Sequence, residues 1–288
     1  MKIMRHIGII ANPKRARAEG TLDHLCMLAK QYDIQLYCIQ DEIADRLDVQ
    51  RVSREELVER SEVVLALGGD GTVLYTASML LESEVPILGI NLGQLGFLTA
   101  VAAEELEQAL DLLVQRRYQI ENRGVVTAQV NQGNQQHTYH ALNDVVLGWG
   151  GSSRIVTLRL LVDEEEVGLF ACDGMILSTP TGSTGHALSN GGPILHPQLP
   201  CMGITFICPH TLSSRPLVIP SESRVRIEIV RSVKSILLSV DGHDQAQLNE
   251  GDCVEISAEK KSVSFIRLAD HSYFSTLTQK LNWHGNLL

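Results

Sequence analysis

The chain has 288 residues, of which 44% are hydrophobic and 20% are charged, and its formal net charge is −10. These values are typical of a soluble globular protein that forms one large domain or two ordinary ones. The excess of acidic residues argues against a general nucleic-acid binder, because no surplus of Lys and Arg exists to neutralise phosphates.

The first part of the chain alternates strand-like and helix-like segments. Short apolar runs predict strands over residues 6–11, 34–39, 63–67 and 85–90, and helical spacing predicts helices over 16–31, 72–81 and 104–117. Strands that alternate with helices imply right-handed crossovers and a parallel sheet covered on both faces. We therefore expect an N-terminal, Rossmann-like parallel α/β domain over residues 1–121.

The hydrophobic pattern changes to period two after residues 121–124. Alternating runs predict strands over 125–130, 137–146, 155–162, 167–172, 224–230, 235–240 and 263–268. The polar segments 131–134 and 163–166 are typical of the turns between such strands. We expect residues 122–268 to form a β-rich, β-sandwich-like domain, followed by a short amphipathic segment over 272–283.

The most informative motif is Gly-Gly-Asp-Gly-Thr at residues 68–72, directly after the apolar run 63–67. A strand that ends in glycines predicts a tight turn, and ligands of open parallel sheets bind beyond the carboxyl ends of the strands. Asp70 is therefore expected at the rim of a cleft, where the glycines let a bulky substrate approach. Thr72 is expected to cap a helix that starts at Val73, with free N–H groups directed at an anion. A plain strand–turn–helix junction explains the same residues equally well.

A second polar motif runs from Cys172 to Pro193. Five glycines between Gly174 and Gly192 are interleaved with seven Ser, Thr or Asn residues, which can bind phosphate or ribose through N–H and hydroxyl groups. An ordinary loop has a similar composition. The apolar strand that leads into the motif and the helical start that follows it favour a functional reading. The motif is not a Walker-A loop, because the required Lys is missing.

Two further motifs are ambiguous on their own. Asn143 and Asp144 lie inside an otherwise apolar stretch, where buried polar groups are costly unless a ligand or a turn satisfies them. A ligand site and a turn between two short strands explain the pair about equally well. The segment Asp241-Gly242-His243 is more typical of a simple hairpin turn than of a site.

The remaining charged residues and the cysteines give weaker indications. Lys14, Arg15 and Arg17 could reach a nucleotide phosphate, although basic groups in such positions are mostly solvated. His186 is the only histidine inside a strong motif, no histidine has metal-ligand spacing, and no protein-held metal is predicted. Six scattered cysteines favour free thiols in a reducing compartment.

No targeting or membrane segment is expected. No apolar stretch reaches the roughly 18 residues of a bilayer span, and the start of the chain leads directly into a strand without a separate signal segment. We expect a cytoplasmic protein with no membrane and no nucleic-acid partner.

Together and in order, these motifs resemble the NAD kinases of bacteria, particularly the proteobacterial members. That family joins a Gly-Gly-Asp-Gly turn, an Asn-Glu/Asp pair, an Asp-Gly followed by Ser-Thr-Pro-Thr-Gly-Ser-Thr, a Gly-Gly-Pro and a later Asp-Gly. The matching residues are Gly68–Thr72, Asn143-Asp144, Asp173-Gly174 with Ser178–Thr184, Gly191–Pro193, and Asp241-Gly242. The Gly-Gly-Asp-Gly turn alone is shared with lipid kinases and phosphofructokinases, so the combination is what is specific.

The resemblance implies a two-domain enzyme that transfers the γ-phosphoryl group of ATP to the 2′-hydroxyl of the adenosine ribose of NAD. The dinucleotide would lie between the two domains, residues 269–288 would return to the first domain, and subunits would form homotetramers. A divalent cation, Mg²⁺ carried in with ATP, would offset the charge of the triphosphate.

The resemblance also assigns site residues by position. Asp70 would be the catalytic base, Asn143 and Asp144 would bind the adenosine part, and Asp173 would bind the nicotinamide amide. The implied nucleotide-binding residues are Asp70, Gly71, Asn143, Asp144, Arg154, Ala171, Asp173, Thr184, Gly185, His186, Ala187, Leu188, Ser189 and His243.

Five residues depart from the usual family pattern. Gly185-His186 replaces the common Ala-Tyr, Asp144 is one methylene shorter than Glu, Ala171 stands where many members have a basic residue, and His243 replaces a frequent Gln. These departures leave the phosphoryl-transfer residues intact, but the choice between NAD and NADH stays open. The choice between ATP and polyphosphate as donor is also open. A lipid or sugar kinase and a non-catalytic NAD or NADP sensor are the alternatives. The net charge of −10 disfavours a membrane-facing lipid kinase, and the presence of Asp70 disfavours a sensor.

Overall fold

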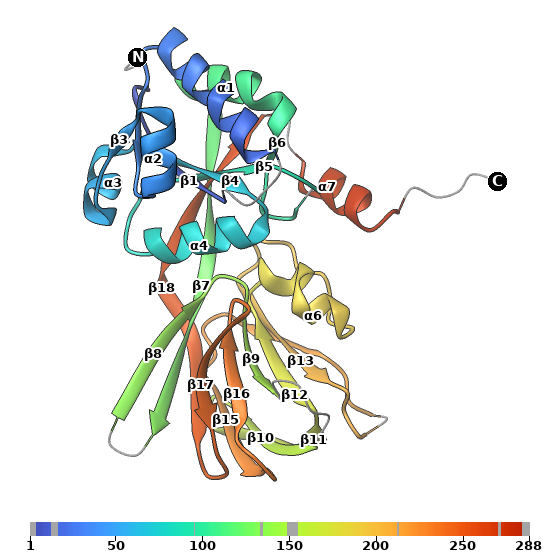
Figure 1. The fold of residues 1–288 in the computed structure, drawn as a ribbon. Coiled ribbons are helices and arrows are strands. Elements are labelled where there is room, and N and C mark those ends of the chain that lie inside the picture. Colours follow the sequence, from blue (N-terminus) through green and yellow to red (C-terminus); the bar gives the residue numbers. More distant parts are fainter. Residues whose placement is uncertain are drawn as a thin grey trace, which may run out of the picture. The chain divides into compact units, whose positions relative to one another are not determined.

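Two long strands mark where the chain passes between its two structural units (Figure 1). The computed structural model describes residues 4–12, 17–94, 96–132, 135–148, 155–211, 213–269 and 272–283. One unit comprises Met1–Asn122 and Val263–Leu288, and the other comprises Arg123–Ser262. The chain leaves the first unit within β7 (Tyr118–Gln132) and returns to it within β18 (Cys253–Leu268).

The first unit contains the expected parallel sheet. Its strands run in the order β18-β5-β4-β1-β2-β3, and β6 pairs with β5. The bounds are β1 His6–Ala11, β2 Gln35–Cys38, β3 Gln50–Arg51, β4 Val63–Gly68, β5 Ile87–Asn91 and β6 Val101–Ala102. All the pairs within β1–β6 are parallel, and the end of β18 joins β5 in parallel through Phe265 and Ile87.

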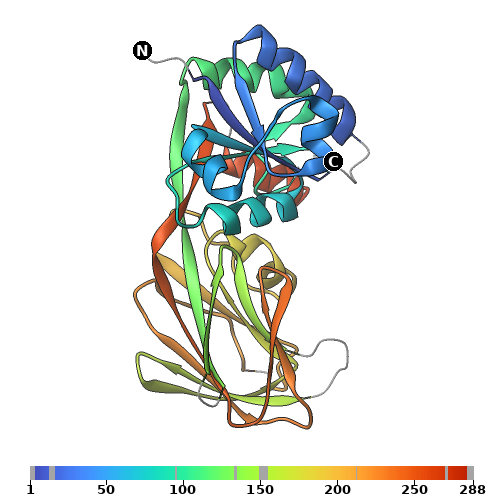
Figure 2. The same cartoon turned by 60° about the vertical axis from the view of Figure 1, so that its left-hand side comes forward.

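Helices cover both faces of this sheet. The helices of this unit are α1 (Ala18–Gln31), α2 (Asp41–Leu47), α3 (Arg54–Arg60), α4 (Asp70–Leu80), the 3₁₀ turn η1 (Ala103–Glu105), α5 (Leu106–Val114) and α7 (Tyr273–Lys280). Ile7 and Ile9 of β1 share one buried core with Leu25 of α1 and Leu110 of α5. The opposite face of the sheet packs on α3 and α4, and Figure 2 shows α4 on the other side from α1 and α5. Burial on both faces explains why these strands read as continuous apolar runs.

The second unit is an antiparallel β structure with one shared core. One sheet has the order β14-β13-β12-β9-β16-β17, and β11, β10, β15 and β18 pair in succession opposite it, with the hairpin β7–β8 beside β18. The bounds are β8 Gln135–Ala141, β9 Asp144–Gly148, β10 Val156–Val162, β11 Glu165–Cys172, β12 Gly174–Ser178, β13 Cys201–Ile207, β14 Leu217–Pro220, β15 Val225–Arg231, β16 Ile236–Val240 and β17 His243–Leu248. Side chains from both strand groups join one buried cluster, such as Leu147 and Leu158. The expected β-rich domain is confirmed.

Some local predictions differ from the structure. The single strand over 137–146 is two strands, β8 and β9, because the chain bends at Leu142 and Asn143. The polar segment 121–124 lies inside β7, and the boundary between the two units falls within it, between Asn122 and Arg123. The short elements α2, β3 and α3 were missed, although Ser53 and Glu56 form a capping box that begins α3.

Among the described residues, we find no helix with both the length and the apolar character that a bilayer span requires.

Candidate active site

Asp70 is the first residue of α4 and follows directly from the end of β4. The helix begins two residues earlier than predicted, with Gly69 in extended conformation as its N-cap. The expectation that Thr72 caps the helix was therefore wrong, because Thr72 lies inside the first turn and its N–H donates to the carbonyl of Gly69 (2.9 Å). An acidic side chain in the first turn is favourable, since the helix N-terminus carries partial positive charge.

A second loop holds the Asp70 carboxylate in place. The N–H of Phe97 donates to Oδ2 of Asp70 (2.9 Å), and the N–H of Leu98 donates to Oδ1 (3.0 Å). These residues lie between β5 and β6, in a segment that the sequence analysis did not single out. The glycines after the apolar run of β5, which resemble those after β4, were the available indication.

A pocket of about 320 Å³ opens beside Gly69 and Gly71, the two glycines that flank Asp70. Its lining residues are Ile10, Ala11, Asn12, Gln40, Gly69, Gly71, Thr72 and Tyr75. The side-chain amide of Gln40 accepts from the N–H of Ala11 (2.9 Å) and donates to its carbonyl (2.8 Å), which fixes one wall. No atom lies within 4 Å of the place where a Cβ on Gly71 would stand. The pocket therefore lies at the carboxyl ends of β1 and β4, where ligands of parallel sheets bind.

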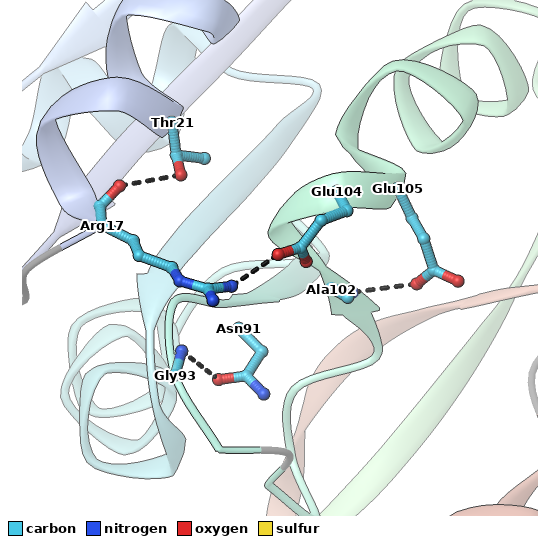
Figure 3. Close-up of polar contacts among 7 residues, drawn as sticks. All are labelled: Arg17, Thr21, Asn91, Gly93, Ala102, Glu104 and Glu105. Atoms are coloured by element: carbon cyan, nitrogen blue, oxygen red, sulfur yellow. Dashed lines mark hydrogen bonds and ion pairs between the residues drawn. The ribbon is translucent and has the colours of Figure 1, made fainter.

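Basic residues near the first strand have other partners or lie outside the described residues. Arg17, before α1, forms an ion pair with Glu104 of η1 (2.5 Å), as Figure 3 shows. The Arg17–Glu104 pair is exposed and contributes little to stability. Lys14 and Arg15 lie outside the described residues.

In the second unit, Asp241 organises the Asn143–Asp144 bend. Its carboxylate accepts three backbone N–H groups, from Leu142 (2.9 Å), Asn143 (2.7 Å) and Asp144 (3.1 Å). The N–H of Asp241 donates to the carbonyl of Asp144 (3.0 Å). The sequence analysis treated Asp241 as a turn residue. Asp241 is indeed in a turn, with φ of 49°. Its carboxylate also holds the Asn143–Asp144 bend through the three backbone hydrogen bonds.

The Ser/Thr/Gly motif meets the same bend. The hydroxyl of Thr179 donates to the carbonyl of Leu142 (2.5 Å), and the N–H of Thr179 donates to the carbonyl of Asn143 (2.9 Å). A Cβ on Gly182 would stand only 2.0 Å from the carbonyl oxygen of Asn143. A Cβ on Gly185 would be 3.9 Å from Nδ2 of Asn143 and 3.9 Å from Oδ2 of Asp144. Three motifs that are far apart in the sequence are thus brought together.

Two polar side-chain groups in this cluster are buried. Oδ1 of Asn143 is buried and accepts no hydrogen bond from the described residues. Burial, together with the nearby Asp241, raises the pKa of Asp144 to about 7. Burial also raises the pKa of Asp241, against the three N–H bonds and His243, which lower it. An unpaired buried acceptor is costly, so a ligand that donates to Asn143 would gain that energy on binding.

Asp144→Asn is expected to stabilise the protein more at pH 8 than at pH 5. The pKa of Asp144 is about 7 in the folded chain, against 3.8 for an unperturbed carboxyl. The folded state therefore binds more protons than the unfolded state between these values, and wild-type stability falls as pH rises through them. Thermal unfolding of both proteins at the two pH values checks this. An equal shift in Tm at both would show that Asp144 ionises normally.

The other predicted residues lie at different places around β12. Asp173 precedes β12 and its N–H donates to the carbonyl of Ile207 (2.9 Å), and the carbonyl of Ala171 accepts from His210 (2.8 Å). Asp144 pairs with Ser178 and Gly148 pairs with Gly174, so Asp173 is at the opposite end of β12 from Asp144. Four residue steps of a strand correspond to roughly 13 Å.

The remaining predicted residues are near the bend or outside the described residues. The hydroxyl of Thr184 donates to the carbonyl of Thr181 (3.3 Å). In α6 (His186–Ser189), His186 and Ser189 are exposed, Leu188 is half-buried and Ala187 is buried. Exposed His243 lies next to Asp241, with its Nδ1 3.2 Å from that residue's carbonyl oxygen. Arg154 lies outside the described residues.

Within the described part of the chain, no group of three or more His, Cys, Asp or Glu side chains could hold a metal ion. A required cation would therefore have to bring other ligands, such as phosphates and water.

Comparison with known proteins gives a consistent result. Family models of the ATP-NAD kinase N-terminal and C-terminal domains match residues 7–118 and 142–268. The chain is similar to an NAD kinase of Moorella thermoacetica, with 38% identity over 98% of this chain and 91% of that protein. It is also similar to yeast NADH kinase complexed with NADH, with a TM-score of 0.88 and 26% identity, covering 100% of this chain and 90% of that one. An Archaeoglobus fulgidus NAD kinase in complex with ATP shares the fold, with a TM-score of 0.72, 24% identity, and coverage of 97% of this chain and 100% of that one.

Proposed function

The chain belongs to the ATP-NAD kinase family, and we propose that Asp70 is the base of its phosphoryl transfer. The reaction moves the γ-phosphoryl group of ATP to the 2′-hydroxyl of the adenosine ribose of NAD, giving NADP and ADP. The observation that carries the assignment to Asp70 is its carboxylate, which the N–H groups of Phe97 and Leu98 fix, at a position whose neighbours Gly69 and Gly71 line the pocket at the carboxyl ends of β1 and β4.

This geometry suits a carboxylate base. Phosphoryl transfer passes through a loose transition state, so positioning and charge neutralisation matter more than base strength. Each carboxylate oxygen of Asp70 accepts one backbone N–H and keeps a further lone pair for the 2′-hydroxyl proton. Open space beside Gly71 leaves room for the ribose.

Residues of the β-rich unit are assigned to the dinucleotide. Asn143 and Asp144 bind the adenosine part, and Thr184 to Ser189 wrap the molecule. Asp173 binds the nicotinamide end. The distance along β12 between Asp173 and Asp144 supports this division, because only an extended ligand reaches both ends. Near neutral pH, the carboxyl of Asp144 can either donate or accept a hydrogen bond, since its pKa is about 7.

A divalent cation, Mg²⁺, completes the proposal. Mg²⁺ commonly binds through substrate phosphates and water with few protein carboxylates, which fits the lack of a metal-ligand cluster among the described residues. When bound with ATP, it supplies neutralisation of triphosphate charge. A cytoplasmic homotetramer is also proposed, on family resemblance, and light scattering of the purified protein tests the subunit number.

The test uses purified full-length chain with ATP, Mg²⁺ and NAD, and an NADP-specific dehydrogenase to detect the product. NADP formation that stops with EDTA and resumes with excess Mg²⁺ is the expected result. NAD binding without product would favour a sensor and overturn the proposal. Absence of both binding and product would favour a lipid or sugar acceptor.

A further inference from the structure

The loop between β5 and β6 approaches Asp70 so closely that one position has no room for a side chain. A Cβ built on Gly96 would stand 1.9 Å from Oδ1 of Asp70 and 2.7 Å from its Cγ. Real Cβ contacts are essentially never under 3.0 Å. The φ of Gly96 is outside the left-handed region, so the need for glycine here is steric and not conformational.

Several contacts hold this loop in position. The N–H of Gly96 donates to the hydroxyl of Thr99 (3.1 Å), and Thr99 is buried. A Cβ on Gly89 of β5 would be 2.8 Å from the carbonyl oxygen of Leu98, so the loop also lies against the backbone of the central sheet. The start of the loop is turned by Asn91, whose side-chain oxygen accepts from the N–H of Gly93 (2.9 Å; Figure 3).

The helix α7 contacts the same loop. The ammonium group of Lys280 in α7 lies 5.5 Å from the centre of the Phe97 ring, a cation–π contact. Phe97 therefore donates its N–H to Asp70, and its ring contacts the ammonium group of Lys280. The loop is held by β5, by Thr99 and by α7, while its own N–H groups hold Asp70.

We propose that residues Gly96–Thr99 are a positioning element for Asp70: Gly96 admits the carboxylate, Phe97 and Leu98 orient it, and Thr99 fixes the loop. This inference rests on the proposed role of Asp70 as the base. A misplacement of about 1 Å in a catalytic group can cost roughly 10²-fold in rate. The element therefore acts on turnover through Asp70.

The test is a double-mutant cycle on kcat and Tm with the full-length enzyme. Gly96→Ala is expected to lower kcat by roughly 10²-fold with KM for NAD within a few-fold. In an Asp70→Ala background the shortest contact is gone and only the 2.8 Å approach to the Thr99 hydroxyl oxygen is left, so Gly96→Ala should cause a much smaller further loss of kcat and a much smaller further fall in Tm. Gly124→Ala is the matched control, because nothing lies within 4 Å of its Cβ position.

A milder pair of variants keeps the test informative if Gly96→Ala folds poorly. Thr99→Val removes the hydroxyl that accepts from the N–H of Gly96 and should lower kcat several-fold. Thr99→Ser keeps this hydroxyl and should keep kcat near the wild-type value. An equal loss from Gly96→Ala with and without Asp70 would overturn the proposal, as would wild-type kcat in both Gly96→Ala and Thr99→Val. Failure of the proposed function is distinct, because the wild-type enzyme would then form no NADP.

Discussion

Asp70→Asn is expected to lower kcat by roughly 10²–10⁴-fold while NAD affinity stays within a few-fold. The amide cannot accept the 2′-hydroxyl proton. It also offers one acceptor oxygen to two backbone donors, the N–H groups of Phe97 and Leu98. Steady-state kinetics gives kcat, and calorimetric titration of NAD gives the affinity separately.

Asp33→Asn is the matched control for this change. It removes the same charge, but Asp33 precedes β2 at the amino ends of the strands, is 83% exposed and has a φ of 56° that Asn tolerates. Wild-type kcat is expected for this control. Near-normal turnover of Asp70→Asn would remove Asp70 from the mechanism.

Asp241→Ala is expected to raise KM for NAD at least roughly tenfold and to lower Tm. The substitution leaves the N–H groups of Leu142, Asn143 and Asp144 without their acceptor, and each unpaired buried N–H costs about 1–3 kcal/mol. The bend that presents Asn143 and Asp144 then loses its shape. Asp241→Asn should have a smaller effect, since its one oxygen can still serve the two donors that Oδ1 serves.

Asp163→Ala separates this effect from simple loss of a turn residue. Asp163 also has positive φ (51°) in a hairpin turn and accepts one backbone N–H, from Arg224 (2.8 Å). We expect its replacement to lower Tm but to leave KM for NAD unchanged. If Asp241→Ala lowers Tm without raising KM, Asp241 is only a structural residue.

The parallel sheet and the place of Asp70 could be predicted because the relevant rules are local. Apolar runs of strand length, glycines at their ends and helical spacing between them determine where a sheet presents its ligand edge. The β-rich unit was predicted by period-two alternation for the same reason. Short elements such as α2 and β3 have too few residues for any period to show.

What could not be predicted depends on contacts between distant segments. Asp241 looked like a turn residue because its turn is local, whereas its three N–H partners are 97 to 99 residues away. Gly96 lies 26 positions from Asp70 in the sequence, and nothing in its neighbours indicates which carboxylate it admits. Of the two explanations of Asn143-Asp144, the turn between two strands is confirmed by the bend at residues 142 and 143, and the ligand site stays a prediction.

The most direct test of the account is phosphoryl transfer from γ-labelled ATP to two NAD analogues whose adenosine ribose lacks one hydroxyl. The account predicts that the 3′-deoxy analogue is phosphorylated by the wild-type chain and that the 2′-deoxy analogue is not. Labelling of the 2′-deoxy analogue, or of neither analogue while NAD is bound, would contradict transfer to the 2′-hydroxyl.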